Sequence, residues 1–141
     1  MAAREFMGDL KLAPFGTSDQ SAYGRRLNAA TRRLMVALPK RAATWGLSRK
    51  LLNIFLRDCL YTTYLTRAYN LSAAERLMEI PLDSITAKAI RAEVPGLPRW
   101  PGVRHLDSDL SAAYQAAALM LARKRGVARV HLDGFWWGTR D

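Results

Sequence analysis

The chain has 141 residues, of which half are hydrophobic and six are proline, and its formal net charge is +10. This size and composition predict one packed domain and exclude a disordered chain. No apolar run is long enough to cross a bilayer, and the single cysteine, Cys59, cannot form a disulfide within the chain. Because the charged N-terminus carries no export signal, we expect a reducing, cytoplasmic setting and no contact with a membrane.

Positive charge dominates the composition, with 22 Lys and Arg residues against 12 Asp and Glu residues. Binding to phosphates releases the counterions that surround a nucleic acid, so a basic protein of this kind favours nucleic acid as its partner. The alternative is a soluble protein from an arginine-rich proteome, whose charge has no specific partner.

Residues 1–16 show no sustained hydrophobic period and contain Pro14 and Gly16, so they are expected to form a tail or an arm. Residues 17–141 are expected to form a single α-helical domain. Helical periods recur along this domain and predict an all-α fold, a compact single-domain bundle of five or six helices.

The first helix of the domain follows a capping-box pattern formed by Thr17 and Gln20. Apolar residues recur at helical spacing from Tyr23 to Leu38 and predict its buried face. Arginines lie opposite or beside this face: Arg25, Arg26, Arg32 and Arg33. They form either a solvated face or an edge that contacts phosphates.

A second helix, from about Ser48 to Ala68, is predicted to form the centre of the bundle, because apolar residues cover most directions around its axis. One side remains polar at helical spacing: Lys50, Asn53, Arg57, Tyr61 and Tyr64. This side is either one wall of a binding site or the solvent-facing strip of the helix.

A second capping-box pattern at residues 72–75 predicts a short helix that Pro81 ends. Asp83 is placed to cap the helix that follows, in which Lys88 points outward.

Residues 94–106 hold three prolines and two glycines and are expected to form a stiff loop. Its Trp100 either stacks on a base or folds back over the core. The last long helix is predicted to begin at Asp107 or Ser108 and to end at Gly126.

The C-terminal segment is rich in aromatic residues, including Phe135, Trp136 and Trp137. A short helix capped by Asp133 competes here with a strand over residues 127–132. Aromatic side chains in such number must be buried in the core or dock on a partner, which could be a second copy of the chain in a homodimer.

Few residues are candidates for chemistry. The two histidines lie far apart without cysteine or carboxylate spacing that suits zinc, so neither a metal nor a cofactor is expected. Lys50 lies near the start of a buried helix, where desolvation and the helix dipole favour a free amine that attacks carbon. Asp83 precedes a helix whose backbone N–H groups hold its carboxylate. Each has a simpler interpretation: Lys50 is a surface charge and Asp83 is an ordinary N-cap.

Two short segments carry a family resemblance: residues 46–53, G-L-S-R-K-L-L-N, and residues 80–84, I-P-L-D-S. The first is similar to the hairpin and following helix of the helix-hairpin-helix DNA glycosylase superfamily, which includes 8-oxoguanine glycosylases and endonuclease III-like enzymes. The second is similar to the stretch that carries the catalytic aspartate of that family. The resemblance implies a helix-hairpin-helix-like centre, with Lys50 as nucleophile and Asp83 as the carboxylate that activates it.

The resulting prediction is a minimal DNA glycosylase, with or without lyase activity, that removes a damaged base flipped out of double-stranded DNA. The expected nucleic-acid contacts are Trp45, Gly46, Ser48, Arg49, Asn53, Arg57, Tyr61, Tyr64, Lys88 and Trp100. The alternatives are a non-catalytic nucleic-acid-binding module built from the same helices and charge, and an α-helical protein-interaction domain.

Overall fold

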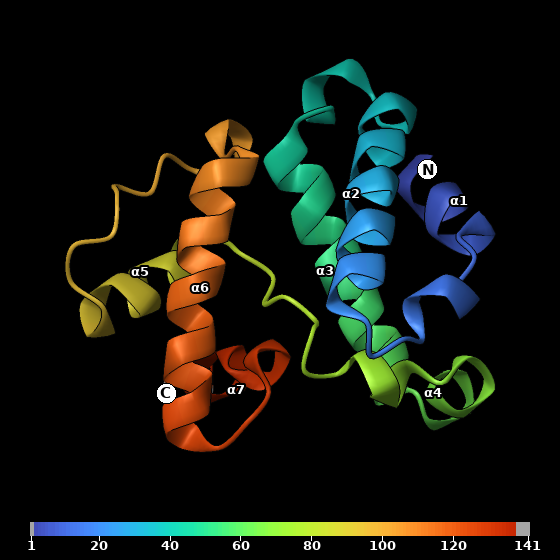
Figure 1. The fold of residues 1–141 in the computed structure, drawn as a ribbon. Helices are drawn as coiled ribbons and strands as arrows, with labels where there is room; N and C mark the ends of the chain where they lie inside the picture. The colour runs from blue at the N-terminus through green and yellow to red at the C-terminus, as the bar shows by residue number, and fades with distance from the viewer. Residues whose placement is uncertain (1, 138–141) are drawn as a thin grey trace.

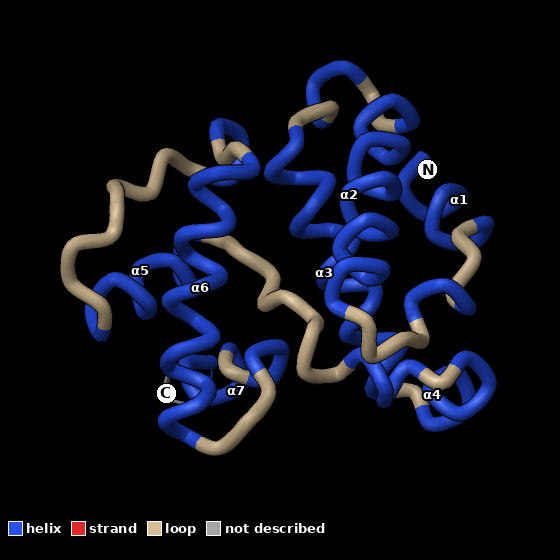
Figure 2. The backbone as a smooth tube through the Cα atoms, in the orientation of Figure 1, coloured by secondary structure: helices blue, strands red, loops and turns tan. Residues whose placement is uncertain are grey.

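The computed structural model describes residues 2–137, and this part consists of helices joined by turns and loops (Figure 1, Figure 2). Its seven α-helices are α1 (Ala2–Asp9), α2 (Gln20–Ala37), α3 (Trp45–Tyr61), α4 (Thr63–Tyr69), α5 (Ser84–Glu93), α6 (Ser108–Arg125) and α7 (Asp133–Trp137). No strand occurs within the described range. The predicted all-α class is confirmed, with seven helices described in place of the expected five or six. None of these helices is long and apolar enough to span a bilayer.

Apolar side chains form two core clusters, which correspond to the two sides of the molecule in Figure 1. The first lies between α1, α2 and α3 and fully buries Leu34 and Leu52. The second lies around α5 and α6 and fully buries Ile90 and Tyr114. Residues 76–83, yellow-green in Figure 1, cross from one cluster to the other.

The N-terminal residues, expected to be a tail or an arm, are packed against the first cluster. α1 places Phe6 and Met7 against that core, and the residues after it add Leu10 and bury Leu12 and Phe15. The spacing of these apolar residues is helical, and the proline and glycine that follow break it only after the helix has ended. Residues 2–16 therefore contribute side chains to the core.

α2 and α3 form the centre of the first cluster. α2 begins later than its capping-box pattern suggests, because the Asp19 carboxylate accepts the Ala22 backbone N–H at 3.2 Å. α3 begins earlier than expected, at Trp45, with Thr44 as its N-cap. It ends at Tyr61 because Thr62 adopts an extended conformation, so the long helix predicted to Ala68 is divided into α3 and α4.

The helix-hairpin-helix centre is not confirmed. Gly46 lies in the first turn of α3, and the connection from α2 runs through a 3₁₀ turn, Lys40–Ala42. α2 and α3 are thus two helices of one core joined by an irregular connection.

The helices of the second cluster begin and end as the sequence predicts. Asp83 caps α5, and Asp107 caps α6 by accepting the Leu110 backbone N–H at 2.8 Å. Gly126 ends α6 with a positive φ of 67°, the left-handed conformation that favours glycine. Residues 129–137 then form a 3₁₀ turn and α7, so the competing strand over residues 127–132 is wrong.

Candidate nucleic-acid interface

The two residues predicted to carry chemistry come from α3 and from the cap of α5. Lys50 is half-buried and lines the same narrow crevice as Leu82, the residue before Asp83. The Asp83 carboxylate accepts the Thr86 backbone N–H at 2.8 Å, which confirms the predicted cap. Neither a hydrogen bond nor an ion pair joins Lys50 to Asp83 in the described part of the chain. The chemistry of this pair stays a prediction.

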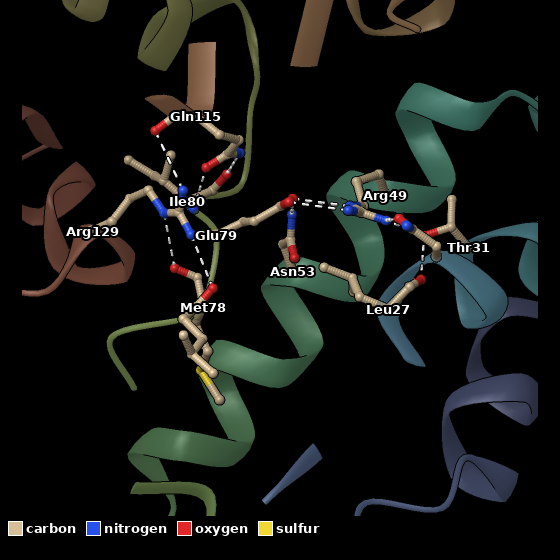
Figure 3. Close-up of polar contacts among 11 residues, drawn as sticks. Leu27, Thr31, Arg49, Asn53, Met78, Glu79, Ile80, Gln115 and Arg129 are labelled. Carbon is tan, nitrogen blue, oxygen red and sulfur yellow. Dashed lines mark hydrogen bonds and ion pairs between the residues drawn. The ribbon is translucent and has the colours of Figure 1, made fainter. Parts of the chain in front are cut away.

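Arg49, an expected nucleic-acid contact, is inside the molecule, with 7% of its surface exposed. Its guanidinium donates to both carboxylate oxygens of Glu79, at 2.9 and 3.0 Å (Figure 3). It also donates to Asn28 Oδ1 and to Thr31 Oγ1, both at 2.9 Å. This bidentate geometry is the strong form of an arginine–carboxylate pair. Arg49 therefore joins α3 to α2 and to the crossing segment, away from solvent.

Glu79 is the centre of a polar network at the junction of the two core clusters. Asn53, a second expected contact, is buried and donates to Glu79 Oε1 at 3.0 Å. Burial by itself raises the pKa of Glu79, but the hydrogen bonds and charge of Arg49, with help from Asn53 and Arg129, hold it below its ordinary value. The carboxylate is therefore held ionised within the fold.

The network continues into the second cluster (Figure 3). The Gln115 side chain of α6 accepts the Ile80 backbone N–H at 3.1 Å and donates to the Ile80 carbonyl at 2.7 Å. Arg129 donates to the carbonyls of Met78 at 3.1 Å and Leu77 at 2.9 Å. We call Arg49, Asn53, Glu79, Gln115 and Arg129 the Glu79 network.

Three further expected contacts, at the start of α3, are packed against other parts of the protein. Ser48 is buried, and its hydroxyl has no hydrogen-bond partner among the described residues. A Cβ at Gly46 would lie 2.0 Å from the Val103 carbonyl oxygen, so this glycine lets α3 approach the loop before α6. Trp45 is half-buried, with the Arg49 guanidinium 5.1 Å from its ring centroid.

Arg57 and Tyr61 bind the C-terminal segment. Arg57 is paired with Asp133 at the start of α7. The Tyr61 hydroxyl lies 2.7 Å from His131 Nδ1, and His131 Nε2 lies 2.5 Å from a Glu75 carboxylate oxygen. These contacts hold residues 129–133 against α3. Arg57 is half-buried, whereas Tyr61 keeps 56% of its surface exposed.

The other expected contacts divide between surface and core. Tyr64 and Lys88 are exposed, Tyr64 with 77% of its surface. Trp100 folds back over the second cluster, where it donates to Ser84 Oγ at 3.2 Å and packs edge-on against Tyr114. Among the C-terminal aromatic residues, Trp136 packs on the same cluster and Phe135 is exposed, whereas the Trp137 side chain lies outside the described part.

Six exposed cations lie on α2 and on the 3₁₀ turn that follows it. The residues concerned are Arg25, Arg26, Arg32, Arg33, Lys40 and Arg41, and all are exposed. None of them forms an ion pair within residues 2–137. We call these six residues the basic face.

The arrangement of the basic face follows from its spacing in the helix. Arg25 and Arg32 are two turns apart, as are Arg26 and Arg33, so each pair lies along one side of α2 about 10 Å apart. The two rows are about 100° apart around the axis and lie beside each other. An extended polyanion along α2 would meet both rows.

The absence of acidic residues within α2 is a sequence signal for the basic face, although none of its six residues was among the predicted nucleic-acid contacts. Residues 20–57 contain no Asp or Glu, so no carboxylate from within that stretch can neutralise its cations. Arg49 and Arg57 find partners from elsewhere in the chain, Glu79 and Asp133, whereas the arginines of α2 find none among residues 2–137.

Comparisons with known proteins add no further constraint. No protein-family model matches the chain, and no curated protein or solved structure matches it either.

Proposed function

We propose that this chain is a non-catalytic nucleic-acid-binding protein and that the basic face of α2 is its contact surface. The observation that carries the proposal is the set of six exposed cations that have no carboxylate partner within residues 2–137, on one helix and its adjoining turn. Arginine presents several N–H donors in a planar fork that fits phosphate oxygens, and four of the six cations are arginines of α2.

Salt-dependent binding tests the proposal. The probe is a labelled strand of about 20 nucleotides, used alone and as a duplex, with affinity measured by fluorescence anisotropy from about 50 mM salt upward. We expect Arg25→Gln combined with Arg32→Gln to weaken binding. The slope of log affinity against log salt should become shallower by between about 1 and 2, because each lost phosphate contact contributes about 0.7 to 0.9.

A matched control removes the same charge elsewhere. Lys88 and Arg91 are exposed on α5, in the second cluster, so Lys88→Gln combined with Arg91→Gln should leave the slope unchanged. An equal effect of the two double variants would show that only net charge matters. A wild-type protein that binds neither probe at about 50 mM salt contradicts the proposal, since phosphate-driven affinity is strongest there.

Base excision by Lys50 and Asp83 is the second candidate. It rests on the resemblance of residues 46–53 and 80–84 to DNA glycosylases, because the crevice that Lys50 shares with Leu82 is too narrow to admit a base. A Schiff base between a lysine and an abasic sugar is trapped by borohydride as a covalent adduct. Under our proposal, no adduct forms on duplexes that carry 8-oxoguanine, uracil or an abasic site. An adduct that disappears in Lys50→Gln would establish the catalytic function instead.

A further inference from the structure

A cavity opens on the basic face where α1 and its following turn meet α2. Its volume is about 290 Å³. The apolar residues that line it, which we call its floor, include Pro14, the buried Phe15 and the half-buried Ala29. Two of these residues, Pro14 and Phe15, belong to the 3₁₀ turn Ala13–Phe15 between α1 and α2.

Charged side chains form the rim of this cavity. Lys11, Arg26 and Arg33 line it together with one carboxylate, Asp9, and all four residues are exposed. The rim therefore has a formal charge of +2, from three cations and one carboxylate. A ligand that fits has a flat, weakly polar body for the floor and a negatively charged group for the rim, which is the composition of a nucleotide.

A second apolar surface adjoins the first along α2. Arg33 also lines a shallow groove with Phe6, Arg32 and Val36. Its guanidinium lies 5.5 Å from the Phe6 ring centroid, and Val36 has 88% of its surface exposed. Aromatic rings and arginine guanidinium planes are the surfaces on which unpaired bases stack in proteins that bind single strands.

From these two surfaces we infer that the cavity between α1 and α2 binds an unpaired base and that the preferred ligand is a single-stranded nucleic acid. The strand backbone follows Arg26 and Arg33, one base enters the cavity, and the next lies on the groove beside Phe6. A base inside a duplex is stacked and paired, so it cannot enter the cavity unless it is first extruded. This inference rests on the proposed function and narrows it to one class of nucleic acid.

The test compares a single strand with its duplex and fills the cavity without changing charge. Ala29→Leu adds apolar volume at the floor, and Ala92→Leu makes the same change at an exposed position of α5 as the control. We expect Ala29→Leu to weaken binding of the strand about tenfold, within the range for losing one stacked base, and to leave duplex binding unchanged. Ala92→Leu should change neither, and thermal melting shows whether each variant is folded.

A second test uses only the wild-type protein and measures its affinity for a strand without bases. A strand of abasic units has the same phosphates but no bases, so the wild-type protein should bind it about tenfold or more weakly than the ordinary strand. Equal binding of the two strands, or equal losses for strand and duplex in Ala29→Leu, would overturn the inference while leaving the basic face as a phosphate site. Displacement of the strand by polyglutamate at equal charge concentration would likewise overturn it in favour of an acidic peptide. Failure of the proposed function is distinct, because then the wild-type protein binds neither strand nor duplex.

Discussion

Arg49 and Arg129 place two guanidinium groups inside the molecule, one on each side of the Glu79 carboxylate (Figure 3). Burial lowers the pKa of Arg129, and the nearby charge of Glu79 opposes that shift. A buried ion pair offsets its desolvation only when its remaining donors and acceptors are satisfied, and here backbone carbonyls, Asn28 and Thr31 serve that purpose. At this scale the same residue type has two roles: the buried Arg49 and the half-buried Arg129 maintain the fold, and the arginines of α2 are exposed to solvent.

Removing the buried hydroxyl groups of Ser48 and Thr31 tests whether each residue stabilises the fold or contributes to binding. Ser48 has a hydroxyl without a hydrogen-bond partner among the described residues, so Ser48→Ala should raise the free energy of unfolding by about 1 kcal/mol or leave it unchanged. The Thr31 hydroxyl donates to the Leu27 carbonyl at 2.7 Å and accepts from Arg49, so Thr31→Val should lower it by about 1–3 kcal/mol. Urea unfolding measures both. If Ser48→Ala instead loses nucleic-acid affinity at unchanged stability, Ser48 belongs to a binding surface after all.

Among the elements, those with local signals could be predicted from the sequence. The starts of α5 and α6 follow from the capping residues Asp83 and Asp107, and the end of α6 follows from Gly126. All three signals lie within one turn of the boundary that they fix, so they need no knowledge of the rest of the fold.

The candidate site could be predicted only in part, because its residues depend on long-range partners. Periodicity assigns Asn53 to the polar side of α3. The carboxylate that accepts its hydrogen bond inside the fold belongs to Glu79, which lies 26 positions further along the chain. Arg49 has the same partner at a separation of 30 positions. For the arginines of α2, the sequence allows either a solvated face or a phosphate-contacting edge. The fold adds that these arginines are exposed and that no carboxylate among residues 2–137 forms an ion pair with them.

The contact between α3 and the loop before α6 depends on glycine at position 46, which has no side chain. We expect Gly46→Ala to lower the free energy of unfolding by about 1–3 kcal/mol, because its Cβ would meet the Val103 carbonyl oxygen at 2.0 Å and the Leu106 Cβ at 2.8 Å. Gly24→Ala is the matched control within α2, where the added methyl group would have open space around it, and it should raise stability by about 0.5–1 kcal/mol. Urea unfolding of both variants decides the matter, and a tolerated Gly46→Ala would mean that the loop moves away at little cost.

Among residues 2–137, two core clusters are joined by polar contacts and by the packing of α3, through Trp45 and Gly46, on the second cluster. The Glu79 network connects α3 with α6, and the C-terminal segment returns to the first cluster through Arg57, His131 and the buried Val130. Each core alone is small, and small cores leave little net stability after the loss of chain entropy. The junction should therefore respond strongly to conditions that change its charges.

Lowering the pH tests that junction, and the pKa of Glu79 determines how the free energy of unfolding should change. Its pKa in the fold is lower than its ordinary value of 4.5, so the unfolded chain binds this proton more readily. The stabilisation is fully present above that ordinary value and is lost as pH falls through the lower value of the folded state. Glu79→Gln should lower stability near pH 7 and flatten the decline in acid, whereas Glu93→Gln removes an exposed ion pair with Arg125 and should cost less than about 1 kcal/mol. Urea unfolding between neutral and acidic pH measures both, and a Glu79→Gln curve parallel to the wild-type curve would show that the Glu79 charge does not hold the two cores together.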